Sequence, residues 1–385
     1  MVLSSKAISY IIVITIGILY TGLFTPIIFG ARFIDLFIGL VFILTLLKRL
    51  SIPKQSIPFI LFTAVATLSG LFNGTEYFAS DLRYFLVLSF SIFLAVYLGN
   101  QISIRDCYLL FIYLIGFYVL VYMLLFLFPT LQTFYQSNVF VQGDEQRLLT
   151  ITGPSLSLLF YLYIPIVFYK AKFLRTTFLF ICSLLLYYTF INSSRQYISI
   201  AFLLVLLNVL YTYKIKIFSL KFVIFTLLIC SLLLIISLYG DSRTLNIFSP
   251  QKDTSFMYRV ISVIDLWHQL SGNTKNLVFG LGAGSTVYLD LGDYLGIRKA
   301  NLIDNTILTI IMKAGVLGLF IFGYGLLKPA LKLERFFIVL LFVPIIIAGL
   351  ISSHVIYNIQ HIFGFFLCLT ILNRQLNNEN SLYNN

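Results

Sequence analysis

The sequence predicts an all-α polytopic membrane protein. Hydrophobic residues make up 60% of the 385 residues and charged residues only 10%, and the mean hydropathy is +0.99. These values lie far outside the range of soluble globular domains. The apolar runs are unbroken for about twenty residues, as membrane helices require, and lack the alternation typical of barrel strands.

About twelve apolar runs predict about twelve membrane helices. They cover residues 8–27, 33–47, 57–73, 84–99, 107–129, 152–169, 174–192, 197–213, 217–239, 304–327, 335–352 and 355–372. Nine helices therefore fall in 1–239 and three in 304–373, and the segment 240–303 between them is a single large extracytoplasmic loop. The Asn-rich end, 374–385, is expected to be a disordered cytoplasmic tail.

The distribution of basic residues predicts the orientation of the chain. With the N-terminus in the cytoplasm, more Lys and Arg residues lie inside than outside, which is the arrangement that membrane insertion favours. The net charge of +12 therefore reflects membrane topology, and we exclude nucleic acid as a partner.

Arginine dominates the basic residues of the predicted outer side, whereas lysine dominates inside. A planar guanidinium can hold phosphate with two parallel hydrogen bonds, so this bias indicates an anionic ligand outside. The alternative is that these residues form ordinary ion pairs with Asp and Glu. The outer arginines are Arg32, Arg83, Arg147, Arg195, Arg243, Arg259 and Arg298.

Arg195 follows Asn192, Ser193 and Ser194 at the outer mouth of its predicted span. An arginine within a membrane segment is costly unless it faces protein, a watery cavity or headgroups. At this depth it can clamp the diphosphate of a lipid carrier, or simply extend toward the interface.

The large outer loop contains one clear helical pattern. Asp253 or Thr254 is suited to cap a helix that ends at Gly272. Apolar residues recur at helical spacing from Phe256 to Trp267, which predicts an amphipathic helix at the outer interface.

The same loop contains the segment FGLGAGS, residues 279–285. Its G-x-G-x-G spacing has no surrounding βαβ unit, so it is not a dinucleotide motif. We expect a flexible turn or a close approach between backbones. Asp304 and Asn305 then open the next span, where Asp304 can serve as a cap or as a general base. Gly315 and Gly318 in that span are expected to permit close helix packing.

The histidines and cysteines predict neither a metal site nor a cofactor. Cys107, Cys182, Cys230 and Cys368 lie in or beside apolar runs, with no C-x-x-C or Cys/His spacing, and are interpreted as core residues. His268 and His354 lie outside and rank below Asp304 as catalytic candidates.

Taken together, these features resemble the O-antigen polymerase and ligase superfamily of bacterial envelope glycan assembly. The resemblance is carried by residues 193–318, namely Ser194-Arg195, Arg259 with Trp267, FGLGAG, Asp304-Asn305 and Lys313-Ala314-Gly315 through Gly318. It implies a membrane-embedded glycosyltransferase with a GT-C-like architecture. The localisation it implies is the bacterial cytoplasmic (inner) membrane, with an active site facing the periplasm.

By this resemblance the substrate is an undecaprenyl-diphosphate-linked oligosaccharide. Arg195 and Arg259 would hold the diphosphate, while a base, for which Asp304 is the candidate, would deprotonate an acceptor sugar hydroxyl. No cofactor or metal is needed, and the expected partners are membrane lipid and a chain-length regulator protein. Substrate-binding roles are expected for Arg83, Arg147, His268, Arg298, Lys299 and Asn305.

Two alternatives to a polymerase stay open. The ligase branch typically has His-Asn where this sequence has Asp304-Asn305, so the residue favours a polymerase of O-antigen or related surface polysaccharide. A lipid-linked oligosaccharide flippase would also have about twelve helices. A flippase predicts a repeat between the two halves, short outer loops and charged residues in the middle of several spans, whereas only Lys313 lies well inside one.

Overall fold

The protein is described from a computed structural model. The residues whose structure is described are 5–19, 27–28, 31–47, 52–73, 75–128, 139–142, 145–148, 154–168, 176–182, 195–213, 254–290, 297–301, 303, 305–351, 354–357 and 359–383. The predicted run 217–239 and most of 174–192 lie outside these residues.

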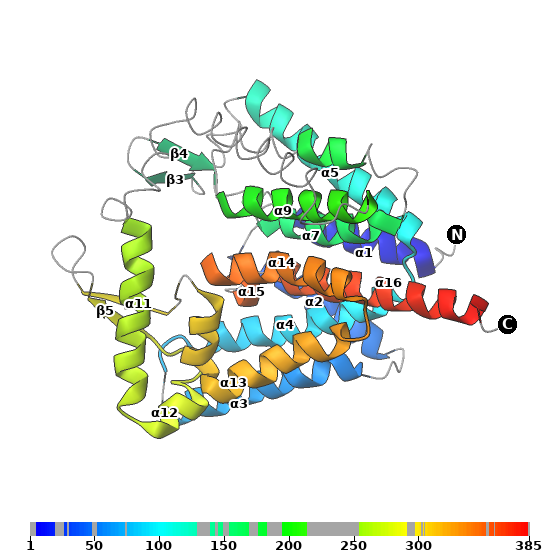
Figure 1. The fold of residues 1–385 in the computed structure, drawn as a ribbon. Helices are drawn as coiled ribbons and strands as arrows, with labels where there is room; N and C mark the ends of the chain where they lie inside the picture. Colours follow the sequence, from blue (N-terminus) through cyan, green and yellow to red (C-terminus); the bar gives the residue numbers. More distant parts are fainter. Residues whose placement is uncertain are drawn as a thin grey trace.

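Helices make up most of the described chain, and the long ones run roughly side by side (Figure 1). Four are long and apolar enough to cross a membrane, namely Lys54–Asn73, Phe78–Gly99, Ile104–Val121 and Thr306–Ala330, and four more apolar helices are shorter. The fold is therefore that of a helical membrane protein, and the count of twelve spans stays a prediction. The helices of this bundle are α1 (Ser5–Leu19), α2 (Phe33–Leu47), α3 (Ile57–Asn73), α4 (Phe78–Gly99), α5 (Ile104–Leu127), α7 (Pro154–Tyr163), α9 (Arg195–Thr212), α13 (Thr306–Ala330), α14 (Arg335–Ile351), α15 (His354–Tyr357) and α16 (Ile359–Tyr383), with 3-10 turns η1 (Lys54–Ser56) and η4 (Ile164–Phe168).

The core lies where α16 packs along α4 and α13 packs along α3. Phe59 of α3 sits at the centre of this packing, with its ring edge-on to Phe322 of α13 at 5.2 Å and to Phe366 of α16 at 5.5 Å. Such edge-to-face pairs add to the apolar burial that holds the helices together. Cys107 and Cys368 are buried in the same core without a disulfide, as predicted.

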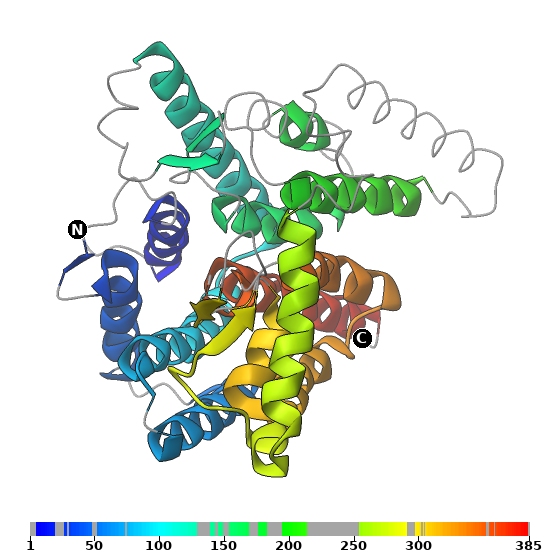
Figure 2. The same ribbon diagram turned by 90° about the vertical axis from the view of Figure 1, so that its left-hand side faces the viewer.

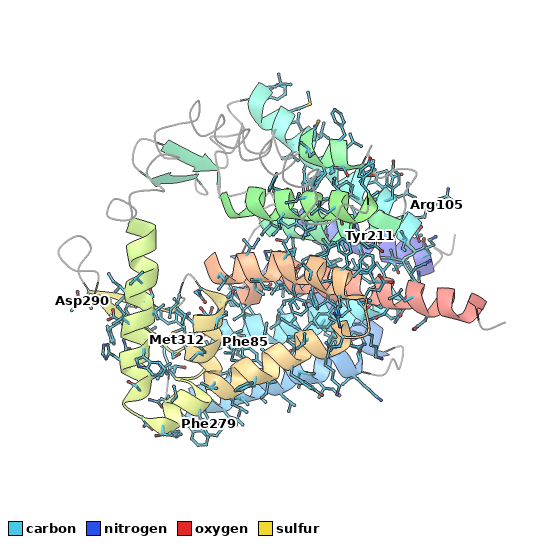
Figure 3. All side chains as sticks on the ribbon, in the orientation of Figure 1. Phe85, Arg105, Tyr211, Phe279, Asp290 and Met312 are labelled. Atoms are coloured by element: carbon cyan, nitrogen blue, oxygen red, sulfur yellow. The ribbon has the colours of Figure 1, made fainter. Side chains whose placement is uncertain are left out.

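The two ends of the bundle differ in what they carry. Arg105 and Tyr211 lie at the end where both chain termini are found, whereas Phe279 and Asp290 lie at the opposite end (Figure 3). The predicted cytoplasmic and outer segments are thus separated to opposite ends. We call the end with Phe279 and Asp290 the outer end.

The outer end carries the described part of the large loop. It contains α11 (Thr254–Ser271), α12 (Thr274–Phe279) and the antiparallel strands β5 (Val287–Asp290) and β6 (Ile297–Ala300). α11 runs across the ends of the bundle helices instead of along them (Figures 1 and 2). Two further hairpins join β1 (Ile27–Ile28) to β2 (Ala31–Arg32) and β3 (Val139–Gln142) to β4 (Glu145–Leu148), so the loops are not purely helical.

The expectation of a disordered C-terminal tail is wrong. α16 continues to Tyr383, through most of the segment 374–385. Leu376 packs against the core, and Arg374 donates hydrogen bonds to the carbonyls of Asn100 and Ile102. Extending a helix that is already packed costs little per residue, even with asparagines of modest helix propensity.

Candidate functional site

The segment FGLGAGS, which we call the glycine motif (residues 279–285), is docked between three bundle helices. Gly280, Gly282 and Gly284 have φ values of 76°, 95° and 77°, a region that side chains with a Cβ rarely adopt. A Cβ at Gly282 would overlap the backbone of Gly70 in α3, and one at Gly284 would overlap Phe78 in α4. The close-approach interpretation is therefore confirmed.

The docked backbone forms hydrogen bonds with α3 and α13. Ala283 N donates to the carbonyl of Ala66 at 2.7 Å, and Leu281 N donates to that of Met312 at 2.7 Å. Side chains of α3 complete the contact, since Ser69 Oγ donates to Gly280 O and Asn73 Nδ2 to Leu281 O. An irregular segment that is docked between helices needs such partners, because its backbone groups are removed from water.

α13 is interrupted where it meets the motif. Gly315 has φ 67° and ψ −168° inside the helix, and a Cβ there would overlap the Val278 carbonyl. Beside this break, the Met312 carbonyl accepts the hydrogen bond from Leu281 N of the motif. Close packing is expected from the sequence at both Gly315 and Gly318. Gly315 makes its close contact with the large loop, whereas Gly318 lies beside Phe62 of α3.

A buried ion pair, Asp81 of α4 and Lys313 of α13, lies beneath the glycine motif. Lys313 Nζ and Asp81 Oδ2 are 2.7 Å apart, and both side chains have no exposed surface. Lys313 Nζ also donates to Ser285 O and to Asn301 Oδ1, each at 2.6 Å. The ammonium therefore has three acceptors, which matches its three protons.

Asp81 is equally well satisfied. Its Oδ2 accepts from Gly284 N at 2.6 Å, and its Oδ1 accepts from Tyr357 Oη at 3.3 Å and from Asn301 Nδ2 at 3.4 Å. Asn301 thus bridges both members of the pair. Through these contacts α4, α13, α15 and the large loop meet at one point.

Asp81 is not among the predicted site residues, because the predicted span begins at residue 84, after the charged residues. The helix begins at Phe78, so Asp81 lies in its first turn. A carboxylate there is tolerated because Lys313 neutralises it and the helix N-terminus favours negative charge. The mid-span position of Lys313 was the available signal, since a buried cation requires a partner.

The amphipathic helix of the large loop begins at Thr254 and ends at Ser271, as predicted. Its inner side buries Leu266 and Leu270 in a small core with β5 and β6. Two polar contacts fix it to β5, because Asp265 Oδ2 accepts from Asp290 N and Gln269 Nε2 donates to Tyr288 O. Its outer side exposes apolar residues at the spacing of one helix face, namely Val260, Val263, Ile264 and Trp267.

A polar cavity of about 420 Å³ lies beside the glycine motif. We call it the outer cavity. It is formed by the C-terminal end of α3 and the residues after it, by α12, and by the β5–β6 hairpin. Tyr288 and Lys299 are directly paired across the hairpin and both line it.

The two arginines predicted to hold diphosphate lie on separate helices near the outer end. Arg195 is the first residue of α9, and Arg259 lies in the second turn of α11. Tyr211, near the other end of α9, lies toward the end of the bundle where both chain termini are found (Figure 3), so α9 begins toward the outer end. α11 begins at its end away from α12, toward α9 (Figures 1 and 2).

The other predicted site residues are scattered. Arg83 Nε lies 3.6 Å from Asp35 Oδ2 and its guanidinium lies over the ring of Tyr84. His268 is exposed on α11, and Lys299 pairs with Glu76. Arg147 belongs to β4 and Arg298 to β6.

The start of α13 differs from the expected cap at Asp304. Asn305 is the N-cap, with its side chain accepting from Leu308 N at 3.1 Å and donating to Leu350 O at 3.1 Å. Asp304 itself lies outside the described residues. Among the residues that the structure describes, no group of three His, Cys, Asp or Glu side chains could hold a metal ion.

Fold and site together define a helical membrane protein whose late outer loop is docked into the ends of its helices. Residues 178–323 match the family model described as O-antigen ligase. This match is consistent with membership of the O-antigen polymerase and ligase superfamily, and it includes the glycine motif and Lys313 but not Asp81. No curated protein matches the sequence.

Proposed function

We propose that the protein is a glycosyltransferase that polymerises undecaprenyl-diphosphate-linked oligosaccharide repeat units at the outer side of the cytoplasmic membrane. The observation that carries the proposal is the docked loop. The glycine motif and the buried ion pair fix the loop to α3, α4 and α13. α11, which carries Arg259, is thereby laid across the outer end toward the start of α9, where Arg195 lies.

In this proposal Arg195 and Arg259 hold the diphosphate of the donor. Asp304 takes the proton from an acceptor sugar hydroxyl, and the resulting oxygen attacks the anomeric carbon of the donor sugar. The bond from that carbon to the diphosphate breaks, and the lipid diphosphate leaves with the electron pair. Because negative charge grows on the leaving group in the transition state, the arginines raise the rate as well as the affinity.

The pairing and burial of Asp81 and Lys313 argue against a transporter. Asp81 and Lys313 satisfy each other and are fully buried, whereas transport residues face a central water-filled path. Alternating access would also have to pull the glycine motif away from the helices that hold it. A large loop that is fixed to the helices suits an enzyme better than a transporter.

A ligase is the second candidate, because the matched family model is described as O-antigen ligase. It would use the same donor chemistry with a different acceptor. Asp304, in place of the histidine typical of the ligase branch, favours the polymerase.

The first test is the size and carrier attachment of surface glycan in a strain that lacks the protein. A polymerase predicts single repeat units on the surface anchor without longer chains. Long chains stranded on the lipid carrier would identify a ligase. Units trapped on the cytoplasmic face would identify a flippase and refute the catalytic role of Arg195.

The second test complements that strain with arginine variants. Arg195→Ala and Arg259→Ala should each reduce polymer synthesis by roughly 10²–10³-fold, the usual effect of losing one donor to a developing anion. Arg105→Ala changes an exposed arginine at the opposite end of the bundle, so it is the matched control and should not reduce polymer synthesis. Normal polymer from correctly inserted Arg195→Ala and Arg259→Ala protein would refute the assignment.

A further inference from the structure

The outer cavity carries almost no net charge. Glu76 and Lys299 both line it and form an ion pair with each other. The hydrogen bond with Glu76 raises the pKa of Lys299 above its ordinary value, so the ammonium stays charged and balances the carboxylate. A diphosphate entering the cavity would meet Glu76 and would have to displace it from Lys299. The cavity is therefore suited to a neutral ligand.

The cavity also offers hydrogen-bonding groups that the described residues leave unused. The side chains of Asn276 and Thr286 line it and have no hydrogen-bond partner within the described parts of the chain. Ser285 lines it too, and its hydroxyl is buried and likewise has no partner there. Amide and hydroxyl groups that both donate and accept match the hydroxyls of a sugar.

One aromatic ring borders these polar groups. Tyr288 is 58% exposed, and it lines the cavity from the centre of β5. Its backbone carbonyl accepts from Gln269 and its strand partner is Lys299, so the backbone from which the ring projects is fixed by α11 and by β6. An aromatic face beside polar groups suits a sugar ring, which has apolar C–H faces and a polar edge.

We propose that the outer cavity is a binding site for a neutral sugar residue, separate from the arginines that hold diphosphate. This proposal rests on the proposed function, because it takes the sugar to be part of the oligosaccharide substrate. The diphosphate would lie toward Arg195 and Arg259, while Asn276, Thr286 and Tyr288 hold a sugar farther along the chain. The buried ion pair positions this site, since Lys313 binds Ser285 O and Asp81 binds Gly284 N at its edge.

The test is binding of lipid-free oligosaccharide to the purified full-length protein in detergent. The probe is the repeat-unit oligosaccharide released by mild acid from the lipid carrier of the same strain, followed by saturation-transfer NMR and titration. Asn276→Ala and Tyr288→Leu should each weaken binding about tenfold, as expected for the loss of one or two good contacts. Lys275→Ala changes a neighbour on α12 that does not line the cavity, and should bind like the wild type.

Inorganic pyrophosphate distinguishes a sugar site from an anion site. Pyrophosphate should not displace the oligosaccharide from the wild-type protein. If it does, and if Lys299→Ala abolishes that displacement, the cavity is an anion site and the proposal is wrong. Equal binding by wild type, Asn276→Ala and Tyr288→Leu would overturn it as well. Elution volume in size-exclusion chromatography, together with the far-UV spectrum, verifies that each variant is folded before its binding is compared.

The outcomes separate this inference from the proposed function. If the deletion strain loses its polymer but the cavity variants restore it fully and bind oligosaccharide normally, the sugar site is wrong and the polymerase stands. If the deletion strain keeps its polymer while the cavity variants lose oligosaccharide binding, the site stands as a glycan site and the polymerase is wrong.

Discussion

Breaking the buried ion pair is expected to destabilise the protein strongly. Lys313→Met would leave Asp81 without its cation and two further acceptors, Ser285 O and Asn301 Oδ1, without their donor. Asp81→Asn would leave Lys313 without its anion in a buried environment. Removing one member of such a pair typically costs about 3–5 kcal/mol, because an uncompensated charge stays buried. Each single variant should lose that amount of the free energy of unfolding.

The double variant Asp81→Asn with Lys313→Met tests the reasoning. No charge is left unpaired in it, so its loss should be smaller than the sum of the two single losses, by roughly 1–3 kcal/mol. The assay is equilibrium unfolding by SDS in mixed micelles, followed by circular dichroism and by the fluorescence of Trp267, the single tryptophan of the chain.

The matched control is the exposed ion pair of the outer cavity. Lys299→Met removes the same residue type from Glu76, where both partners are solvated, and should have little effect on stability. If Lys313→Met is no more destabilising than Lys299→Met, or if the two single losses simply add in the double variant, the buried pair does not hold the loop as described.

Three further predictions concern the loop and the outer arginines. Gly282→Ala should lower the free energy of unfolding by about 1–3 kcal/mol because of the positive φ alone, and further because the new Cβ overlaps α3. In the control Gly272→Ala the new Cβ has no heavy atom within 4 Å, so stability should be unchanged. Thermal unfolding in detergent compares the two variants. Trp267 should be quenched by brominated lipid more than by aqueous iodide, because its helix face is exposed and apolar; the reverse order would show that α11 faces water. Arg83→Gln should lower stability, because the ion pair with Asp35 is lost, yet leave polymer length unchanged. Shortened polymer chains from a stably folded variant would instead support the predicted substrate-binding role of Arg83.

Apolar runs located helices well where no charge interrupted them. The runs 57–73 and 335–352 correspond to α3 (Ile57–Asn73) and α14 (Arg335–Ile351) almost residue for residue. The predicted run that begins at residue 84 misses residues 78–83 of α4, because these include the charged residues Asp81 and Arg83. Single-sequence hydropathy counts such charges against a membrane helix, whereas the folded protein pairs each of them with a residue on another helix.

The candidate site was only partly predictable. The spacing of the glycine motif indicated a close backbone approach, but its contacts with α3 and α4 are long-range, and no local pattern records them. The amphipathic pattern gave the bounds of α11 because helical periodicity is a local property. The outer cavity could not be predicted, since its lining comes from three segments that meet only after folding. The roles of Arg195, Arg259 and Asp304 stay predictions.

The members of the buried ion pair are synthesised at different times, because they lie far apart in the sequence. Asp81 and Gly284 are 203 residues apart, and Lys313 is synthesised later still. α4 must therefore enter the membrane while its carboxylate has neither of these partners. A chain whose synthesis stops before residue 313 would contain α3 and α4 but would keep an uncompensated acid near the membrane surface. Completion of the outer site therefore requires synthesis at least as far as Lys313, which is the cation of the pair.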